Sequence, residues 1–186
     1  MHMTGSQTVG PFLHIGLADL YSDKLVTQAQ SDAIVISGRM LDGDGNAVPD
    51  GMVEIWQADA GGIYPDPQDG RSVTAGFRGF GRVATDKDGR FAFTTIKPGS
   101  VPGPGGKPQA PHIMVSVFMR GLIKRLATRI YFPGEAANDS DPVLQLVPQE
   151  RRATLIARAV DARRFEWDVV IQAGPHGRAE TVFFDV

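Results

Sequence analysis

Short runs in which apolar and polar residues alternate make up most of this chain. The clearest run spans residues 164–172, where Phe165, Trp167, Val169 and Ile171 share one face and Arg164, Glu166 and Asp168 lie on the other. In an extended strand successive side chains point to opposite faces. The alternation therefore predicts a strand with one buried face.

Eight runs of this kind predict a single mainly β domain. They lie at residues 33–40, 51–58, 81–85, 90–96, 112–119, 124–132, 164–172 and 180–186. Turn sequences rich in glycine, aspartate and asparagine join them in consecutive pairs, which is typical of antiparallel hairpins. One short helix is expected at residues 149–158, and the connections at 61–79 and 98–111 are too long to be simple turns. The pattern predicts an antiparallel β-sandwich with one short helix and long loops.

Composition narrows the possible functions. The 186 residues carry a net charge of −2, which provides no basic surface for nucleic acid and no polybasic patch for a membrane. No apolar run approaches the roughly 20 residues that span a bilayer. The absence of cysteine excludes disulfides and thiol nucleophiles and agrees with a reducing compartment. We therefore expect a cytoplasmic protein.

One predicted strand carries half of a metal chelate. A His-x-His sequence would present two imidazoles to one ion, because residues two apart in a strand share a face. Here the second position is Met114, whose soft thioether suits copper(I) far better than ferric iron. His112 and Met114 are expected to lie opposite Ile113 and Val115, and Arg129 is expected on the outer face of the next strand.

Several short sequences occur in an order that resembles the intradiol ring-cleaving dioxygenases. They are EIWQADAGGIY at 54–64, GFGR at 79–82, DG at 88–89, TIKPG at 95–99 and PHI at 111–113. SQTVGPF at 6–12 and AETVFFD at 179–185 extend the match over nearly the whole chain. The ordered series is much more specific than any single motif. The resemblance implies a transthyretin-like β-sandwich that takes part in the O2-dependent cleavage of a catechol ring.

Only half of the family's iron ligands are retained. Catalytic chains of this family bind non-haem Fe(III) through two tyrosines and two histidines, and the corresponding positions here are Tyr64, Val101, His112 and Met114. The arginine that catalytic chains place just before the histidine pair falls near Gln109. Within the family this chain is most similar to the alpha-type chains, which carry no iron. The resemblance therefore implies that the chain by itself has no catalytic residue and no metal site.

The resemblance also implies a catalytic partner. That partner is a beta-type chain that holds Fe(III), and the (αβ)n hetero-oligomer cleaves protocatechuate with O2 to 3-carboxy-cis,cis-muconate. Residues 1–30 would form an arm that contacts the partner, and residues 31–186 would form the sandwich domain. The positions that correspond to the pocket for the substrate carboxylate are Thr8, Gly10, Pro11 and Arg129.

Two other functions are compatible with these residues. A non-enzymatic, transthyretin-like binding or structural module would explain the missing ligands, whereas the nearly complete series of motifs favours a dioxygenase subunit. An independent oxygenase would need a different metal at Tyr64, His112 and Met114. Each of the three also has a structural interpretation: Tyr64 as a packed turn aromatic, His112 as a buried histidine with a satisfied hydrogen bond, and Met114 as an apolar plug.

Overall fold

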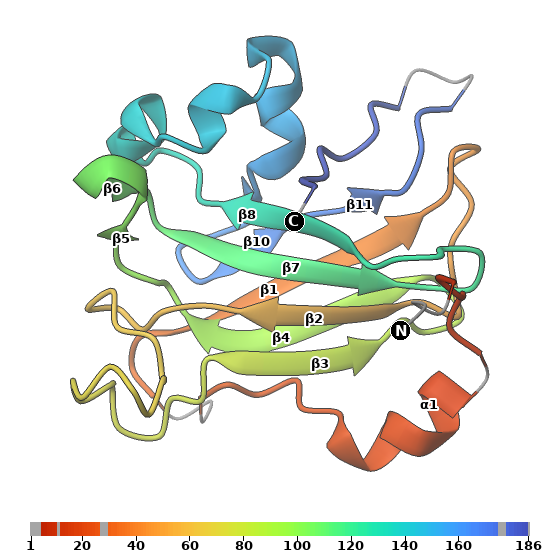
Figure 1. The fold of residues 1–186 in the computed structure, drawn as a ribbon, viewed down its shortest axis with the longest axis horizontal. Helices are drawn as coiled ribbons and strands as arrows, with labels where there is room; N and C mark the ends of the chain where they lie inside the picture. The colour runs from red at the N-terminus through yellow and green to blue at the C-terminus, as the bar shows by residue number, and fades with distance from the viewer. Residues whose placement is uncertain (1–4, 11, 27–29, 175–177, 186) are drawn as a thin grey trace.

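Two β-sheets lie face to face in the computed structural model, which describes residues 5–10, 12–26, 30–174 and 178–185 (Figure 1). One sheet has four antiparallel strands in the order β3-β2-β7-β8. Their bounds, in that order, are Phe80–Ala84, Met52–Trp56, His112–Phe118 and Leu126–Tyr131. The expected mainly β sandwich is therefore confirmed.

The second sheet is built around β1, Ala33–Leu41. One edge of β1 pairs with β4 in antiparallel fashion, and the other edge pairs with β10 and β11 in parallel. A short strand, β9, extends the sheet beyond β10, and β5 and β6 form a separate small pair. The bounds of these strands are Arg90–Ile96 for β4, Val101–Pro102 for β5, Pro108–Gln109 for β6, Arg158–Ala159 for β9, Arg164–Glu166 for β10 and Val169–Val170 for β11.

The parallel pairing differs from the expected arrangement. The sequence pattern predicts that the run at 164–172 forms a hairpin with the run at 180–186, but the first run is divided into β10 and β11, which both pair with β1. The two strands are separated because Trp167 and Asp168 bind the backbone of β1: Trp167 N donates to Ser37 O, and Asp168 Oδ1 accepts from Arg39 N, both at 2.9 Å. Gly38 permits this approach, since a Cβ there would lie 1.7 Å from the Trp167 carbonyl oxygen.

Residues 178–185 connect the two sheets and add no regular strand. Thr181 N donates to Val170 O of β11 at 3.0 Å, and Phe184 N donates to Ala127 O of β8 at 2.8 Å. The predicted strand at 180–186 is wrong because the backbone hydrogen bonds of this segment are divided between two sheets.

The inward faces of the sheets form one core, as alternation predicts. Ile113, Val115 and Val117 of β7 are each at most 2% exposed. Trp167 and Val169, from the chain that forms the second sheet, belong to the same buried cluster. Burying a large apolar side chain contributes about 1.5–3 kcal/mol, so these positions dominate the stability of the sandwich.

A helix is present where the sequence predicts one, but it is of the 3-10 type and shorter. The one at 149–158 is a 3-10 helix, η5, that covers Gln149–Leu155. It ends there because Ala157 N donates to Tyr131 O of β8 at 2.9 Å, which binds the chain to the sheet. An α-helix, α1, occurs instead at Phe12–Leu17, where the sequence pattern predicts none. The other 3-10 helices are η1 at Ala18–Leu20, η2 at Pro104–Gly106, η3 at Ala136–Ser140 and η4 at Leu144–Leu146.

A second, smaller apolar cluster covers the outer face of β8. Alternation correctly places Tyr131 on that face, but the residue is fully buried because η4 and η5 pack over it (Figure 1). The members of this cluster are Ala110, Tyr131, Leu144, Val147, Leu155 and Val182.

The region before β1 is partly integrated into the sandwich. Ser22 bridges to Arg82 of β3 and Lys24 bridges to Thr94 of β4, and Leu25 is fully buried in the main core. Upstream, Ile15 of α1 is 72% exposed, and α1 lies to one side of the sheets (Figure 1). No helix within the described ranges has the length and apolar character needed to cross a membrane.

Candidate functional site

A row of side chains crosses the outer face of the four-stranded sheet. Strand register places Phe80 beside Trp56, Trp56 beside Met114, and Met114 beside Arg129. Met114 is 42% exposed, whereas its strand neighbour Ile113 is fully buried, so the row faces away from the core. The outer face therefore presents an apolar surface that ends at an arginine.

The loop after β2 returns Tyr64 to this row. The Tyr64 ring stacks on Trp56, with ring centroids 5.8 Å apart and planes at 16°. Asp59 fixes the loop by accepting hydrogen bonds at 2.9 Å from the backbone amides of Gly61 and Ile63. Burial alone would raise the pKa of Asp59, but the hydrogen bonds that it accepts outweigh burial and lower that pKa. The stacking on Trp56 agrees with the interpretation of Tyr64 as a packed aromatic.

The guanidinium of Arg129 lies at the end of the row and has no carboxylate partner among the described residues. Its Nη1 donates to Gln109 Oε1 at 2.7 Å and to Tyr131 Oη at 3.3 Å. Its Cζ lies 6.0 Å from the centroid of the Phe184 ring. A half-buried guanidinium with no counter-charge is suited to bind an external carboxylate through paired N–H groups.

His112 is buried beside this arginine and is neutral. It is 3% exposed and lies opposite Tyr131 in the register of β7 and β8. Nδ1 is 2.8 Å from Ala110 O, and because a carbonyl can only accept, Nδ1 carries the proton of the neutral ring. Burial lowers the pKa of His112 to about 4, and the charge of Arg129 acts in the same direction. The burial and the hydrogen bond agree with the structural interpretation of His112.

The neutral His112 predicts a loss of stability in mild acid. Between pH 6.5 and about 4 the unfolded chain protonates this imidazole while the folded chain does not. Stability is therefore complete above pH 6.5 and falls by up to about 3 kcal/mol as the pH drops to about 4. Urea unfolding at a series of pH values measures the slope. His112→Gln, which keeps a donor for the Ala110 carbonyl, should flatten the slope; an unchanged slope would contradict the prediction.

The four positions that correspond to the family's iron ligands do not fit Fe(III). Val101 is buried and has no donor atom, and Met114 offers only a soft thioether. Burial raises the pKa of the Tyr64 phenol, and the charge of Arg129 offsets this only in part. Within the described part of the chain, no group of three or more His, Cys, Asp or Glu side chains could hold a metal ion.

Met114 does not close a pocket on this chain. As an apolar plug it would need a covering surface, since within this chain its side chain is 42% exposed on the outer face of β7. The position is apolar but uncovered, as is Phe80 at 38%.

The residues predicted to hold a substrate carboxylate are not brought together within one chain. Thr8 Oγ1 accepts a hydrogen bond from Gly121 N at 2.8 Å, in the turn between β7 and β8. Gly10 O accepts from Leu13 N at 3.0 Å, and Pro11 lies outside the described residues. Arg129 is near the opposite end of the β7–β8 hairpin, where it pairs with Met114. Thr8 and Arg129 therefore lie at opposite ends of one hairpin.

Three residues near Arg129 are connected to it only by the tertiary structure. Gln109 and Tyr131 contact the guanidinium, and the fully buried Asp141 contacts Tyr131. The sequence pattern marks Gln109 only as the position of a missing arginine. Nothing in the local sequence connects Asp141 to a strand ten residues upstream.

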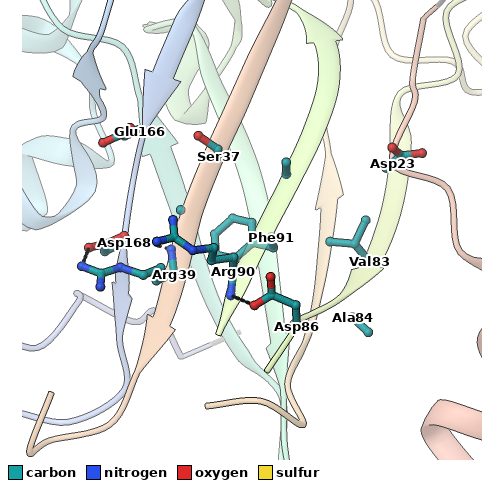
Figure 2. Close-up of a pocket in the computed structure, with 12 residues that line it drawn as sticks. Asp23, Ser37, Arg39, Val83, Ala84, Asp86, Arg90, Phe91, Glu166 and Asp168 are labelled. Atoms are coloured by element: carbon teal, nitrogen blue, oxygen red, sulfur yellow. Dashed lines mark hydrogen bonds and ion pairs between the residues drawn. The ribbon is translucent and has the colours of Figure 1, made fainter. Parts of the chain in front are cut away.

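A large groove lies elsewhere, on the outer face of the second sheet. It has a volume of about 710 Å3 and is lined by two arginines and four carboxylates. Figure 2 shows Arg39 turned toward Asp168, with Nη2 and Oδ2 3.4 Å apart, and Arg90 and Glu166 along the same groove. Because its cations and anions are mixed, the groove favours no class of charged ligand.

Comparisons with known proteins complete the description of the site. The sequence pattern of the dioxygenase family matches residues 14–173. The alpha chain of protocatechuate 3,4-dioxygenase from Pseudomonas putida is 42% identical in an alignment 199 positions long, gaps included, and the alignment covers 98% of this chain and 96% of that one. The beta chain of protocatechuate 3,4-dioxygenase from Burkholderia cepacia is 36% identical in an alignment 181 positions long, gaps included, and the alignment covers 90% of this chain and 75% of that one.

A solved structure shares the fold. The dioxygenase domain of a dioxygenase–carbohydrate-binding protein fusion from Streptomyces sp. SirexAA-E aligns with a TM-score of 0.64 and 28% sequence identity. The alignment covers 82% of this chain and 88% of that domain. Both the sequence and the fold of this chain are therefore similar to those of proteins described as dioxygenases.

Proposed function

Because this chain belongs to the dioxygenase family, with intradiol enzymes as its relatives, we propose that it is the alpha-type, non-iron-binding subunit of a protocatechuate 3,4-dioxygenase. The observation that carries the proposal is the side-chain set at the family's iron position. Only Tyr64 and His112 there carry suitable donor atoms, and the cationic Arg129 lies beside them. The nearly full-length similarity to an alpha chain supports the same assignment.

The iron of the proposed enzyme is held by a beta-type partner chain. That chain and this one form an (αβ)n hetero-oligomer, and the similarity of this chain to a beta chain supports pairing between two related sandwiches. When bound by the partner, Fe(III) supplies the redox chemistry by which protocatechuate and O2 yield 3-carboxy-cis,cis-muconate. The cytoplasmic location expected from the sequence is part of the proposal.

This chain contributes binding of the substrate's negative charge. Arg129 offers its guanidinium to the protocatechuate carboxylate, a charge-assisted contact worth about 1.5–3 kcal/mol. Its lack of a carboxylate partner within the described ranges supports this role. The N-terminal arm, residues 1–30, contacts the partner and supplies Thr8, Gly10 and Pro11 to the same kind of pocket. Thr8 and Arg129 lie at opposite ends of one hairpin. For both to line one pocket, assembly must either move the arm or bring the arm of a second copy of this chain next to Arg129.

Reconstitution tests the proposed function. Purified alone, this chain should retain no stoichiometric iron and convert no protocatechuate. Mixed with a beta-type chain, it should form a complex with iron on the beta chain and produce 3-carboxy-cis,cis-muconate. The reaction is followed by the loss of protocatechuate absorbance and by the uptake of O2. Iron bound tightly by this chain alone, or no association with the beta-type chain, would overturn the proposal.

A further inference from the structure

We propose that Gln109 and Tyr131 are positioning residues that together hold Nη1 of Arg129 and turn its Nε–Nη2 edge toward the substrate carboxylate. The inference rests on the proposed function, because it assigns a purpose to contacts around the arginine that would bind the substrate. It adds two residues that do not themselves touch the substrate but determine which edge of the guanidinium is presented.

The first support is the way Asp141 orients Tyr131. Asp141 is fully buried, and its Oδ1 accepts from the backbone amides of Val143 at 2.9 Å and Leu144 at 2.7 Å, while its Oδ2 accepts from Ala110 N at 2.7 Å. A carboxylate accepts hydrogen bonds only, so the Tyr131 hydroxyl, 3.1 Å from Oδ1, must donate to it. The oxygen of Tyr131 is then left as an acceptor facing Arg129.

Gln109 is oriented in a comparable way. Its Nε2 donates to Pro102 O at 2.9 Å across the β5–β6 pair. This contact fixes the amide so that Oε1 is available as an acceptor, and Oε1 receives Arg129 Nη1 at 2.7 Å. Both acceptors are thus set by contacts on the side away from the guanidinium.

The consequence follows from the number of hydrogens on the guanidinium. Nη1 carries two, and Gln109 and Tyr131 provide one acceptor for each. Nε and Nη2 have no hydrogen-bond acceptor within the described part of the chain, and together they form the parallel pair of donors that a carboxylate accepts bidentately. The ring of Phe184 beside Cζ limits rotation of the plane. The guanidinium is therefore held in one orientation before the substrate arrives.

Kinetics of the reconstituted αβ enzyme test the proposal. Tyr131→Phe and Gln109→Leu should each raise KM for protocatechuate about 3- to 10-fold, the range for one neutral to charge-assisted hydrogen bond, with kcat little changed. The Ki of catechol, which has the same ring without the carboxylate, should stay constant. In an Arg129→Ala background neither substitution should change KM further, because both act through the guanidinium.

The outcomes separate this inference from the proposed function. Equal shifts in the KM of protocatechuate and the Ki of catechol, or full additivity with Arg129→Ala, would show a merely structural role and overturn the inference. Normal KM values for both single variants would also overturn it, even if Arg129→Ala raises KM as the proposed function requires. If one variant fails to fold, the other decides. Gln145→Leu, which removes an exposed amide that donates to Asn138 O at 3.3 Å and has no bond to Arg129, is the control and should leave KM unchanged.

Discussion

Replacing Arg129 with alanine in the reconstituted enzyme is expected to raise KM for protocatechuate by about 10- to 100-fold. The guanidinium has no carboxylate partner among the described residues, so its removal strands no buried anion of this chain. The loss should therefore appear as weaker binding of the substrate's charge. A contact of equal strength in the ground state and the transition state affects KM and leaves kcat nearly constant.

The measurement is steady-state kinetics together with the iron content of the complex, which should not change. Arg163→Ala is the matched control, since Arg163 is exposed in the bend between β9 and β10 of the second sheet, whereas Arg129 and the Thr8 contact belong to the β7–β8 hairpin of the first. It removes the same charge but should leave KM within about twofold, as expected for an exposed arginine remote from the substrate. An unchanged KM in Arg129→Ala, with assembly intact, would remove Arg129 from the substrate pocket.

Replacing Asp141 with alanine is expected to destabilise this chain by about 4 kcal/mol. The carboxylate is fully buried and accepts hydrogen bonds from three backbone amides and the Tyr131 hydroxyl. Alanine would leave these buried donors without an acceptor, which costs about 1–3 kcal/mol for a single group and less per group when several relax together. The second apolar cluster, which contains Tyr131 and Leu144, should loosen first.

Urea unfolding of the purified chain provides the test. Asp139→Ala is the matched control, because Asp139 is exposed in the neighbouring 3-10 helix η3, and its loss should change stability by less than about 0.5 kcal/mol. Equal stabilities for the two variants would show that Asp141 is not the anchor of this cluster. The reconstituted Asp141→Ala enzyme should in addition have a raised KM, since Tyr131 would lose the acceptor that orients its hydroxyl.

The resemblance to intradiol dioxygenases was available from the sequence and is confirmed by the comparisons. Alternation also predicted correctly that His112 and Met114 lie opposite Ile113 and Val115, because the period of a strand depends only on local geometry. It could not predict that Trp167 and Asp168 would interrupt a strand, since both are drawn to the backbone of β1 more than a hundred residues away. The helix predicted at 149–158 ends at Leu155 for a similar reason, because Ala157 N donates to Tyr131 O of β8.

By itself the sequence determined the strand periodicity, the family, and the loss of donor atoms at Val101 and Met114, because those follow from residue identity and local geometry. Only the tertiary structure decided what surrounds Arg129. Gln109, Tyr131 and Asp141 come from separate segments, and their contacts depend on the path of the loops between strands. Strand alternation states which face a side chain occupies but not what covers that face. Tyr131 lies on the predicted face, and its role in orienting the arginine depends on the helices packed over it.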